Sequence, residues 1–222
     1  MILIIQKYSS MLLEAMGKTL LLTLLSLFFA MIIGLIFSLM NVGKNRFFNL
    51  IGTVYVDAVR GVPLIVLAFF VYFGVPTGMK YLGFDQFRFS ALQAGTIALS
   101  MNCGAYMAEI IRAGIESVDR GQMEASRSLG INYRLSMQTI VLPQAIRTMI
   151  PSIINQFIIT LKDTSILSVI GFPELTNMGK TVVANTMMSL ETWTVVGFMY
   201  MIVIISLSKI AKQVERRVNR GR

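Results

Sequence analysis

The chain has 222 residues, of which 55% are apolar and 14% charged, and its mean hydropathy is +0.70. Soluble domains carry about 25% charged residues, so the composition excludes an ordinary soluble domain and indicates a polytopic membrane protein. The net charge of +9 is typical of a membrane protein whose cytoplasmic loops are rich in Lys and Arg, and we predict no nucleic-acid partner. The chain has no histidine, which excludes a histidine metal site or proton relay.

Five apolar stretches predict membrane-spanning helices, because a helix needs about 20 mostly apolar residues to cross a bilayer. The predicted spans are about 19–40, 57–78, 91–111, 143–166 and 191–210. The second contains Pro63, which either kinks the helix or marks its first turn. The fourth reaches span length only if Lys162 and Asp163 lie inside it. We expect a single all-α membrane domain over 1–222, with residues 1–18 as a candidate surface-lying helix.

Positive charge is unevenly divided between the two sides of these spans. The richer side holds Lys44, Arg46, Arg112, Arg120, Arg127, Arg134, Lys209, Lys212, Arg216, Arg217, Arg220 and Arg222. The opposite loops hold Lys80, Arg88 and Lys180. The positive-inside rule then predicts an external N-terminus, a cytoplasmic C-terminus and a cytoplasmic loop at about 112–142.

This central loop has the signals of two short helices around a glycine turn. Residues 117–129 have a helix-forming composition, Gly130 suits a helix end, and Asn132 can cap a second helix. Glu124 can pair with Arg120 or Arg127 and brace the structure. We expect a rigid knob that fits a groove on a partner protein, and the alternative is an ordinary solvated loop.

Several motifs give the chain a family resemblance over nearly its whole length. The knob motif is Gly121 to Gly130 followed by Ile140-Val141-Leu142-Pro143. The other motifs are Arg60-Gly61-Val62-Pro63-Leu64, Ala105 to Ile115, Pro143-Gln144-Ala145 and Lys162-Asp163-Thr164-Ser165. Together they resemble the permeases of the polar amino-acid family of binding-protein-dependent ABC importers. Two positions depart from that pattern: Ser126 stands where alanine is usual, and Leu67 where glutamine is common.

The resemblance implies the type I ABC importer permease fold, with the 112–142 loop as a coupling loop in a bacterial plasma (inner) membrane. The residues it assigns to ATPase coupling are Gln122, Glu124, Ala125, Ser126, Arg127 and Gly130. The implied partners are two ATP-binding cassette subunits, a second permease subunit (identical or homologous) and an extracytoplasmic binding protein. The chain itself has no Gly-x-x-x-x-Gly-Lys-[Ser/Thr] phosphate loop. We therefore expect a non-catalytic subunit without a bound cofactor, with ATP and Mg²⁺ on its partners.

Polar residues inside the predicted spans are candidates for a substrate pathway. The candidate substrate-binding residues are Asn102, Tyr106, Asn155, Gln156, Thr160 and Asp163. Helical spacing puts Asn102 and Tyr106 on one face of the third span. It puts Gln156, Thr160 and Asp163 on one face of the fourth span, and Asn155 on an adjacent stripe of that span. Asp163 can accept an ammonium group, and Asn102 and Thr160 can donate to a carboxylate. The alternative is that these residues join helices to one another or lie at the membrane interface.

Two further pairs of charged residues have a structural interpretation. Glu109 and Arg112 are predicted to form one ion pair near the cytoplasmic end of the third span, and Asp57 and Arg60 another in the second.

The sequence favours one substrate class and disfavours two rival functions, because it shows neither an inverted repeat nor a convincing catalytic or metal cluster. Related permeases for basic amino acids can carry a glutamate at the position of Gln156, which favours a neutral polar substrate such as glutamine or cystine over a basic one. A stand-alone channel or secondary transporter would predict inverted repeats and pairs of broken helices. A membrane enzyme would need a nucleophile with a base, or a metal cluster.

Overall fold

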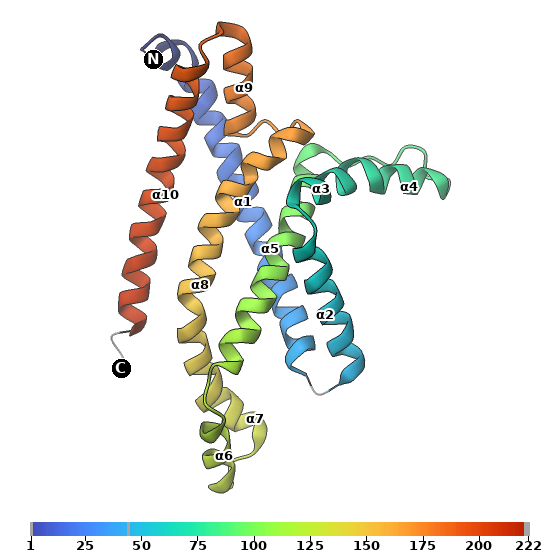
Figure 1. The fold of residues 1–222 in the computed structure, drawn as a ribbon, viewed down its shortest axis with the longest axis vertical. Coiled ribbons are helices and arrows are strands. Elements are labelled where there is room, and N and C mark those ends of the chain that lie inside the picture. Colours follow the sequence, from blue (N-terminus) through green and yellow to red (C-terminus); the bar gives the residue numbers. More distant parts are fainter. Residues whose placement is uncertain (1, 44, 220–222) are drawn as a thin grey trace.

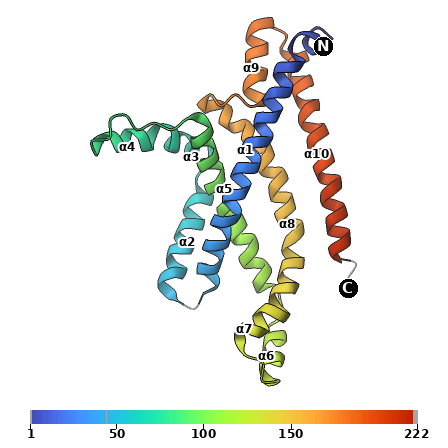
Figure 2. The ribbon, with the colours of Figure 1, turned by 180° about the vertical axis from the view of Figure 1, so that it is seen from behind.

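The computed structural model describes residues 2–43 and 45–219, and throughout that part of the chain the regular elements are helices (Figure 1). Lys44, Arg220 and Arg222, which entered the charge comparison, lie outside the described residues. The helices that follow the long axis are α1 (Ile2–Val42), α2 (Arg46–Gly61), α5 (Ala91–Glu116), α8 (Leu142–Asp163) and α10 (Ser189–Asn219) (Figures 1 and 2). The all-α architecture predicted from composition is confirmed.

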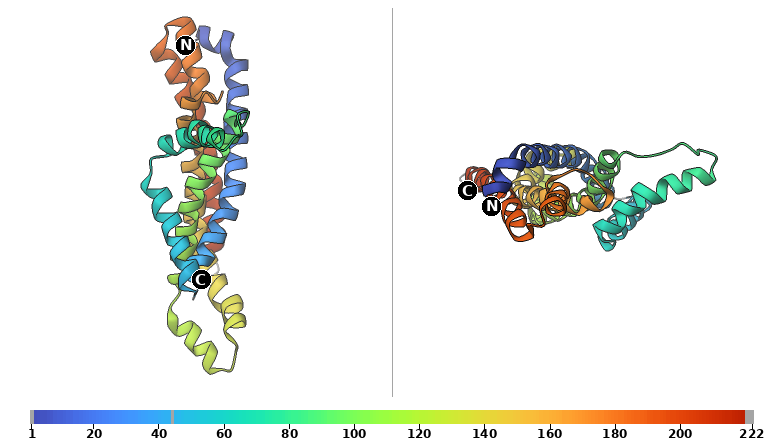
Figure 3. Two further views of the ribbon diagram at one scale, coloured as in Figure 1. Left: turned by 90° about the vertical axis from the view of Figure 1, so that its right-hand side faces the viewer. Right: turned by 90° about the horizontal axis from the view of Figure 1, so that it is seen from above.

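The remaining helices lie at the ends or at the side of this bundle. α6 (Arg120–Ser128) and α7 (Tyr133–Ser136) form one tip of the molecule, and they are the two helices of the knob (Figure 1). α9 (Leu175–Thr186) lies at the opposite end, beside the N-terminus (Figure 1). α3 (Leu64–Phe69), the π-helical turn η1 (Phe70–Gly74) and α4 (Val75–Tyr81) run across the long axis and project sideways (Figures 1 and 3).

The second predicted span, 57–78, is therefore broken and changes direction. α2 ends at Gly61, Val62 is extended (φ −102°, ψ 130°), and Pro63 stands at the N-cap of α3. Proline lacks the N–H that a continuing helix needs, and it pushes the residue before it out of the α region. Pro63 thus starts a new helix.

Helix α1 is one continuous helix of 41 residues, so residues 2–18 do not form a separate surface helix. Its first turns carry Ile4, Leu12 and Ala15, which are fully buried against the core residues Leu175 and Val182 of α9. These apolar contacts hold the start of α1 against α9, at the end of the bundle opposite α6 and α7.

The fourth predicted span also begins earlier than expected. α7, the π-helical turn η2 (Met137–Val141), α8 and the 3₁₀ turn η3 (Thr164–Ile170) follow one another without a break. The π turn lies just before Pro143, whose missing N–H removes one α-helical hydrogen bond. The knob is thus joined directly to α8.

By length and composition, four helices among the described residues are candidates to cross a membrane: Ile2–Val42, Leu64–Tyr81, Tyr133–Ile170 and Ser189–Arg217. α5 is 26 residues long but is rich in Ala and Gly, which makes it less apolar than these four helices. The count of five spans stays a prediction.

The bundle core is the crossing of α1 over α5, and small residues allow the close approach. A Cβ added to Gly34 would lie 2.5 Å from the Cβ of Met107, and one added to Gly104 would lie 2.6 Å from Cγ2 of Ile33. The Ser100 hydroxyl donates to the carbonyl of Ser26 across the same contact at 3.2 Å. Close packing of this kind is how membrane helices associate where burial from water provides little driving force.

At the end of the bundle opposite α6 and α7, hydrogen bonds of Glu174 and Leu175 join three helices. Glu174, the N-cap of α9, is 0% exposed and accepts from the N–H groups of Thr176 (2.8 Å) and Asn177 (2.6 Å) and from Oη of Tyr200 on α10 (2.9 Å). The neighbouring Leu175 N–H donates to Oγ1 of Thr19 on α1 at 3.1 Å. Burial raises the pKa of the Glu174 carboxyl, and its hydrogen bonds only partly oppose that rise.

Candidate functional site

A cavity of about 460 Å³ lies where α5 and α8 face the break between α2 and α3. It is lined by Arg60, Gly61, Val62, Pro63, Leu64, Asn102, Tyr106, Gln156, Ile159 and Asp163. Its volume is within the range of about 300–1,000 Å³ that is usual for small-molecule sites.

Four of the six candidate substrate residues meet in this cavity. Asn102 and Tyr106 come from α5, and Gln156 and Asp163 come from α8. Asn102 and Gln156 are 7% and 6% exposed, so their amide groups lie inside the protein at the cavity wall. Helical spacing gave the correct face for each of these residues.

The other two candidates have different surroundings. Thr160 is fully buried, and its hydroxyl donates to the sulfur of Cys103 on α5 at 3.2 Å. It joins α8 to α5, as the helix-joining alternative predicts, and Thr160 is not among the lining residues of the cavity. Its role as a carboxylate donor stays a prediction. Asn155 is exposed and is not among the lining residues of the cavity.

The irregular backbone of Val62 and Pro63 forms part of the cavity wall. Non-helical backbone within a membrane protein is tolerated where it is buried in protein or lines a water-filled cavity. Broken helices are also a common way to expose backbone groups at transport sites. The break that Pro63 causes therefore coincides with the cavity.

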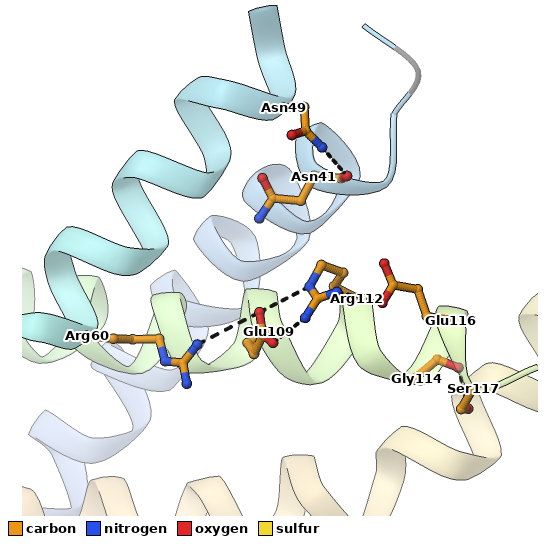
Figure 4. Close-up of polar contacts among 8 residues, drawn as sticks. All are labelled: Asn41, Asn49, Arg60, Glu109, Arg112, Gly114, Glu116 and Ser117. Atoms are coloured by element: carbon orange, nitrogen blue, oxygen red, sulfur yellow. Dashed lines mark hydrogen bonds and ion pairs between the residues drawn. The ribbon is translucent and has the colours of Figure 1, made fainter. Parts of the chain in front are cut away.

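A second, polar cavity of about 310 Å³ lies beside the first, toward the knob. Its walls include Asp57, Arg60, Glu109, Arg112 and Glu116. The predicted Glu109–Arg112 pair is confirmed: Nε of Arg112 donates to Oε2 of Glu109 at 3.1 Å, and its Nη2 donates to Oε1 (Figure 4). Nη1 of Arg112 also donates to Glu116 at 2.5 Å.

The predicted pair of Asp57 with Arg60 is wrong. Among the described residues, the ion pair of Arg60 is made to Glu109, with Nη1 and Oε2 3.8 Å apart (Figure 4). The guanidinium also lies 5.4 Å from the ring centroid of Tyr106. The Arg60 side chain extends from α2 toward α5, because the Tyr106 ring and the Glu109 carboxylate on α5 both attract its guanidinium.

The knob has the predicted construction. Asp119 caps α6 by accepting from the N–H of Gly121 at 2.6 Å, so the helix starts at Arg120. At its other end Gly130 has φ +82°, and the N–H groups of Gly130 and Ile131 donate to the carbonyls of Arg127 and Ser126. This pair of bonds is a Schellman ending.

The second knob helix is fixed by a side-chain cap. Oδ1 of Asn132 accepts from the N–H of Leu135 at 2.9 Å. The turn and both helix ends are thus set by local hydrogen bonds.

The predicted coupling residues lie mostly on the knob surface. Gln122, Glu124, Ala125, Arg127 and Gly130 are exposed. Ser126 is 3% exposed, and its hydroxyl donates to the carbonyl of Met123 at 2.9 Å. Its position inside the knob explains why a small residue is needed there.

Two features of the knob differ from the sequence-based expectation. No ion pair of Glu124 with Arg120 or Arg127 forms in the described part of the chain, so the carboxylate is exposed and does not brace the knob. Apolar side chains also gather at the tip, where Leu129 is 81% exposed, Tyr133 49% and Leu135 46%. The apolar residue after the Ser128 helix end was the available signal for this surface.

The fold and the site together define an all-α membrane protein with a polar cavity and a protruding two-helix knob. Residues 26–220 match the model of the binding-protein-dependent transport system inner membrane component family. The chain belongs to this family. It is a membrane component of an ABC importer, and such components work with ATPase and binding-protein subunits.

Individual relatives span almost the whole chain. The glutamine transport system permease protein GlnP of Escherichia coli (strain K12) is 34% identical, covering 94% of this chain and 93% of its own. The arginine transport system permease protein ArtQ of Bacillus subtilis (strain 168) is 36% identical, covering 93% and 91%.

A crystal structure of an amino acid ABC transporter with histidines is 35% identical, with a TM-score of 0.89 over 97% of both chains. The methionine ABC transporter MetNI in an inward-facing conformation, 19% identical with a TM-score of 0.79, shares the fold. The ABC importer permease fold expected from the sequence is thus confirmed.

Proposed function

We propose that this chain forms the path by which an ABC importer moves a polar amino acid into the cytoplasm. The observation that carries the proposal is the 460 Å³ cavity, in which Asn102, Tyr106, Gln156 and Asp163 meet beside a helix break. A zwitterionic amino acid requires both hydrogen-bond donors and a carboxylate in its site, and these side chains supply both. The amino-acid transport named for the relatives supports the same conclusion.

The working unit contains more than this chain. We infer two permease subunits, identical or homologous, two ATPase subunits and an extracytoplasmic binding protein. The permease contributes no cofactor and no hydrolytic chemistry of its own, while ATP and Mg²⁺ bind the ATPase subunits. Each knob, α6 with α7, fits a groove on an ATPase, and its exposed apolar tip supports that contact.

The orientation proposed is N-terminus outside and C-terminus inside, in a bacterial plasma membrane. The knob and the C-terminal end of α10 lie away from the N-terminus and α9 (Figure 1). This arrangement supports the orientation that the positive-inside rule predicts, because the cytoplasmic ATPases then face the knob.

Alternating access follows from how the knob is connected. The helical run from Tyr133 to Ile170 is unbroken, so it joins the knob to the wall of the cavity that carries Gln156 and Asp163. When ATP binding moves the ATPase grooves, displacement of the knob moves this rod and with it that wall. The cavity then opens alternately to the outside and to the cytoplasm.

The substrate we favour is a neutral polar amino acid such as glutamine or cystine. Among the described residues that line the cavity, Asp163 is the single carboxylate, and the buried Gln156 is a neutral group suited to reading a polar side chain. A basic amino acid is the alternative, since relatives of both kinds are equally similar.

The test is uptake into proteoliposomes that contain the complete importer, with ATP inside and the binding protein outside. Unlabelled amino acids compete with a labelled one. We expect uptake to require ATP, and competition to be strongest from glutamine or cystine. Strongest competition from arginine or lysine would instead establish the basic alternative.

Liposomes that lack the ATPase subunits are the control. Uptake that continues at the same rate without those subunits would contradict the proposal, because it would identify a stand-alone channel or secondary transporter.

A further inference from the structure

Arg60 lies between the two cavities and forms part of the wall of both. It stands in the last turn of α2, next to the helix break at Gly61. Its side chain is 37% exposed, so it is neither locked in the core nor fully in solvent. A charged group in that position can reach into either cavity.

The present partner of Arg60 holds it weakly. Glu109 is bound first by Arg112, through two N–H donors of the same guanidinium, and only at 3.8 Å by Arg60. The distance from Arg60 exceeds the usual range of about 2.7–2.9 Å for a charge-assisted hydrogen bond. Arg60 therefore keeps donors that a better acceptor can use.

The cavity lacks another cation for a substrate carboxylate. Among the described residues that line it, Arg60 is the one positive side chain, and Asp163 on α8 is the one negative side chain. A zwitterionic amino acid has one group of each sign. The planar guanidinium of arginine binds carboxylates through two parallel hydrogen bonds.

We propose that Arg60 exchanges partners during transport: it pairs with Glu109 when the cavity is empty and binds the α-carboxylate of the amino acid when the cavity is filled. The proposal rests on the function proposed above and adds a residue that selects for the carboxylate. Asp163 then faces the ammonium group, and Gln156 faces the side chain.

The test compares amino acids with their amides, which lack the carboxylate charge. Labelled glutamine and arginine are bound to the permease–ATPase complex in nanodiscs without the binding protein, so that the transmembrane cavity alone is measured. Glutaminamide and argininamide are the competitors. We expect Arg60→Gln to weaken amino-acid binding by about 10- to 100-fold, the loss typical of a charge-assisted hydrogen bond, and to leave amide binding unchanged.

Two further variants keep the result interpretable. Glu109→Gln removes the carboxylate that competes for Arg60, so it should tighten amino-acid binding severalfold without affecting the amides. Lys80→Gln, which removes one positive charge on the laterally projecting α4, should change neither amino-acid binding nor amide binding. Retention of the ATPase subunits confirms that each variant is folded.

The outcomes separate the inference from the function on which it rests. If Arg60→Gln weakens amino acid and amide equally, or preserves the preference for the amino acid, Arg60 does not bind the carboxylate. If the wild-type complex binds neither the amino acids nor their amides, the proposed cavity is itself refuted, and this inference falls with it.

Discussion

Asp163 is the negative end of the proposed amino-acid site. It lies at the last position of α8 and lines the same cavity as Arg60. An ionised carboxylate can accept an ammonium group, whereas the asparagine of Asp163→Asn keeps the shape and loses the charge.

We expect Asp163→Asn to raise the KM for uptake about 10- to 100-fold, the range for loss of a charge-assisted hydrogen bond. Co-purification of the ATPase subunit should be unaffected. Asp85→Asn, in the connection after α4, is the matched control and should transport normally. Unchanged uptake by Asp163→Asn would remove Asp163 from the site.

Glu174 gives a pH dependence whose sign follows from its burial. Its pKa in the folded protein is raised above the ordinary value of 4.5. At pH values between 4.5 and the raised pKa of the folded state, the folded protein binds more protons than the unfolded chain. The stability that this group contributes therefore falls as pH rises through that window. Glutamine at this position is neutral at every pH.

The prediction concerns Tm in detergent, measured for wild type and Glu174→Gln from about pH 5 to pH 8. The variant's Tm minus the wild-type Tm should increase with pH, because only the wild type must keep a buried carboxylate charged. Taking the difference removes the contribution of other titrating groups. A difference that is constant or decreases with pH would show that Glu174 does not titrate in this way.

At the scale of elements, the crossing of α1 and α5 depends on close backbone contact. A Cβ on Gly34 would approach both the Cβ of Met107 at 2.5 Å and the backbone N of Ala108 at 3.2 Å. Neither atom is the end of a flexible side chain, so a helix must move.

Gly34→Val should therefore destabilise the protein by about 1–3 kcal/mol, the usual cost of overpacking a core. Gly197→Val makes the same change in α10, where an added Cβ meets nothing within 4 Å, and should have a much smaller effect on Tm. Equal loss of Tm in the two variants would mean that helix propensity rather than packing is responsible.

The knob was predictable because its signals are local. The positive φ of Gly130 and the cap at Asn132 depend on residues within a few positions of them. Helical spacing likewise assigned Asn102 and Gln156 to the faces that line the cavity.

Tertiary contacts decided the features that the sequence did not reveal. Arg60 has Asp57 nearby on its own helix, yet it turns toward Glu109 and Tyr106 on α5. Thr160 shares a face with Gln156, but that face also meets Cys103. Pro63 signals a break, whereas the sideways course of α3 after it depends on tertiary contacts with α5 and η3.

The whole molecule is polarised along its long axis. One end carries the knob, and the opposite end carries α9 (Figures 1 and 2). The two cavities are lined by residues of the helices between these ends, and Glu174 is buried at the start of α9. The unbroken helical run from Tyr133 to Ile170 begins in the knob and continues past the cavity that Gln156 and Asp163 line. This continuity supports the proposal that displacement of the knob moves the wall of the proposed amino-acid site.

The central claim, that ATPase subunits act on this chain through the knob, is tested most directly by their co-purification with a knob variant. Leu129→Glu places a charge at the apolar tip, where Leu129 is 81% exposed. Leu82→Glu makes the same change at the C-terminal end of α4, the helix that projects sideways, where Leu82 is 72% exposed. We predict that Leu129→Glu loses the ATPase subunits and that Leu82→Glu retains them. A Leu129→Glu complex with a full complement of ATPase would contradict the account.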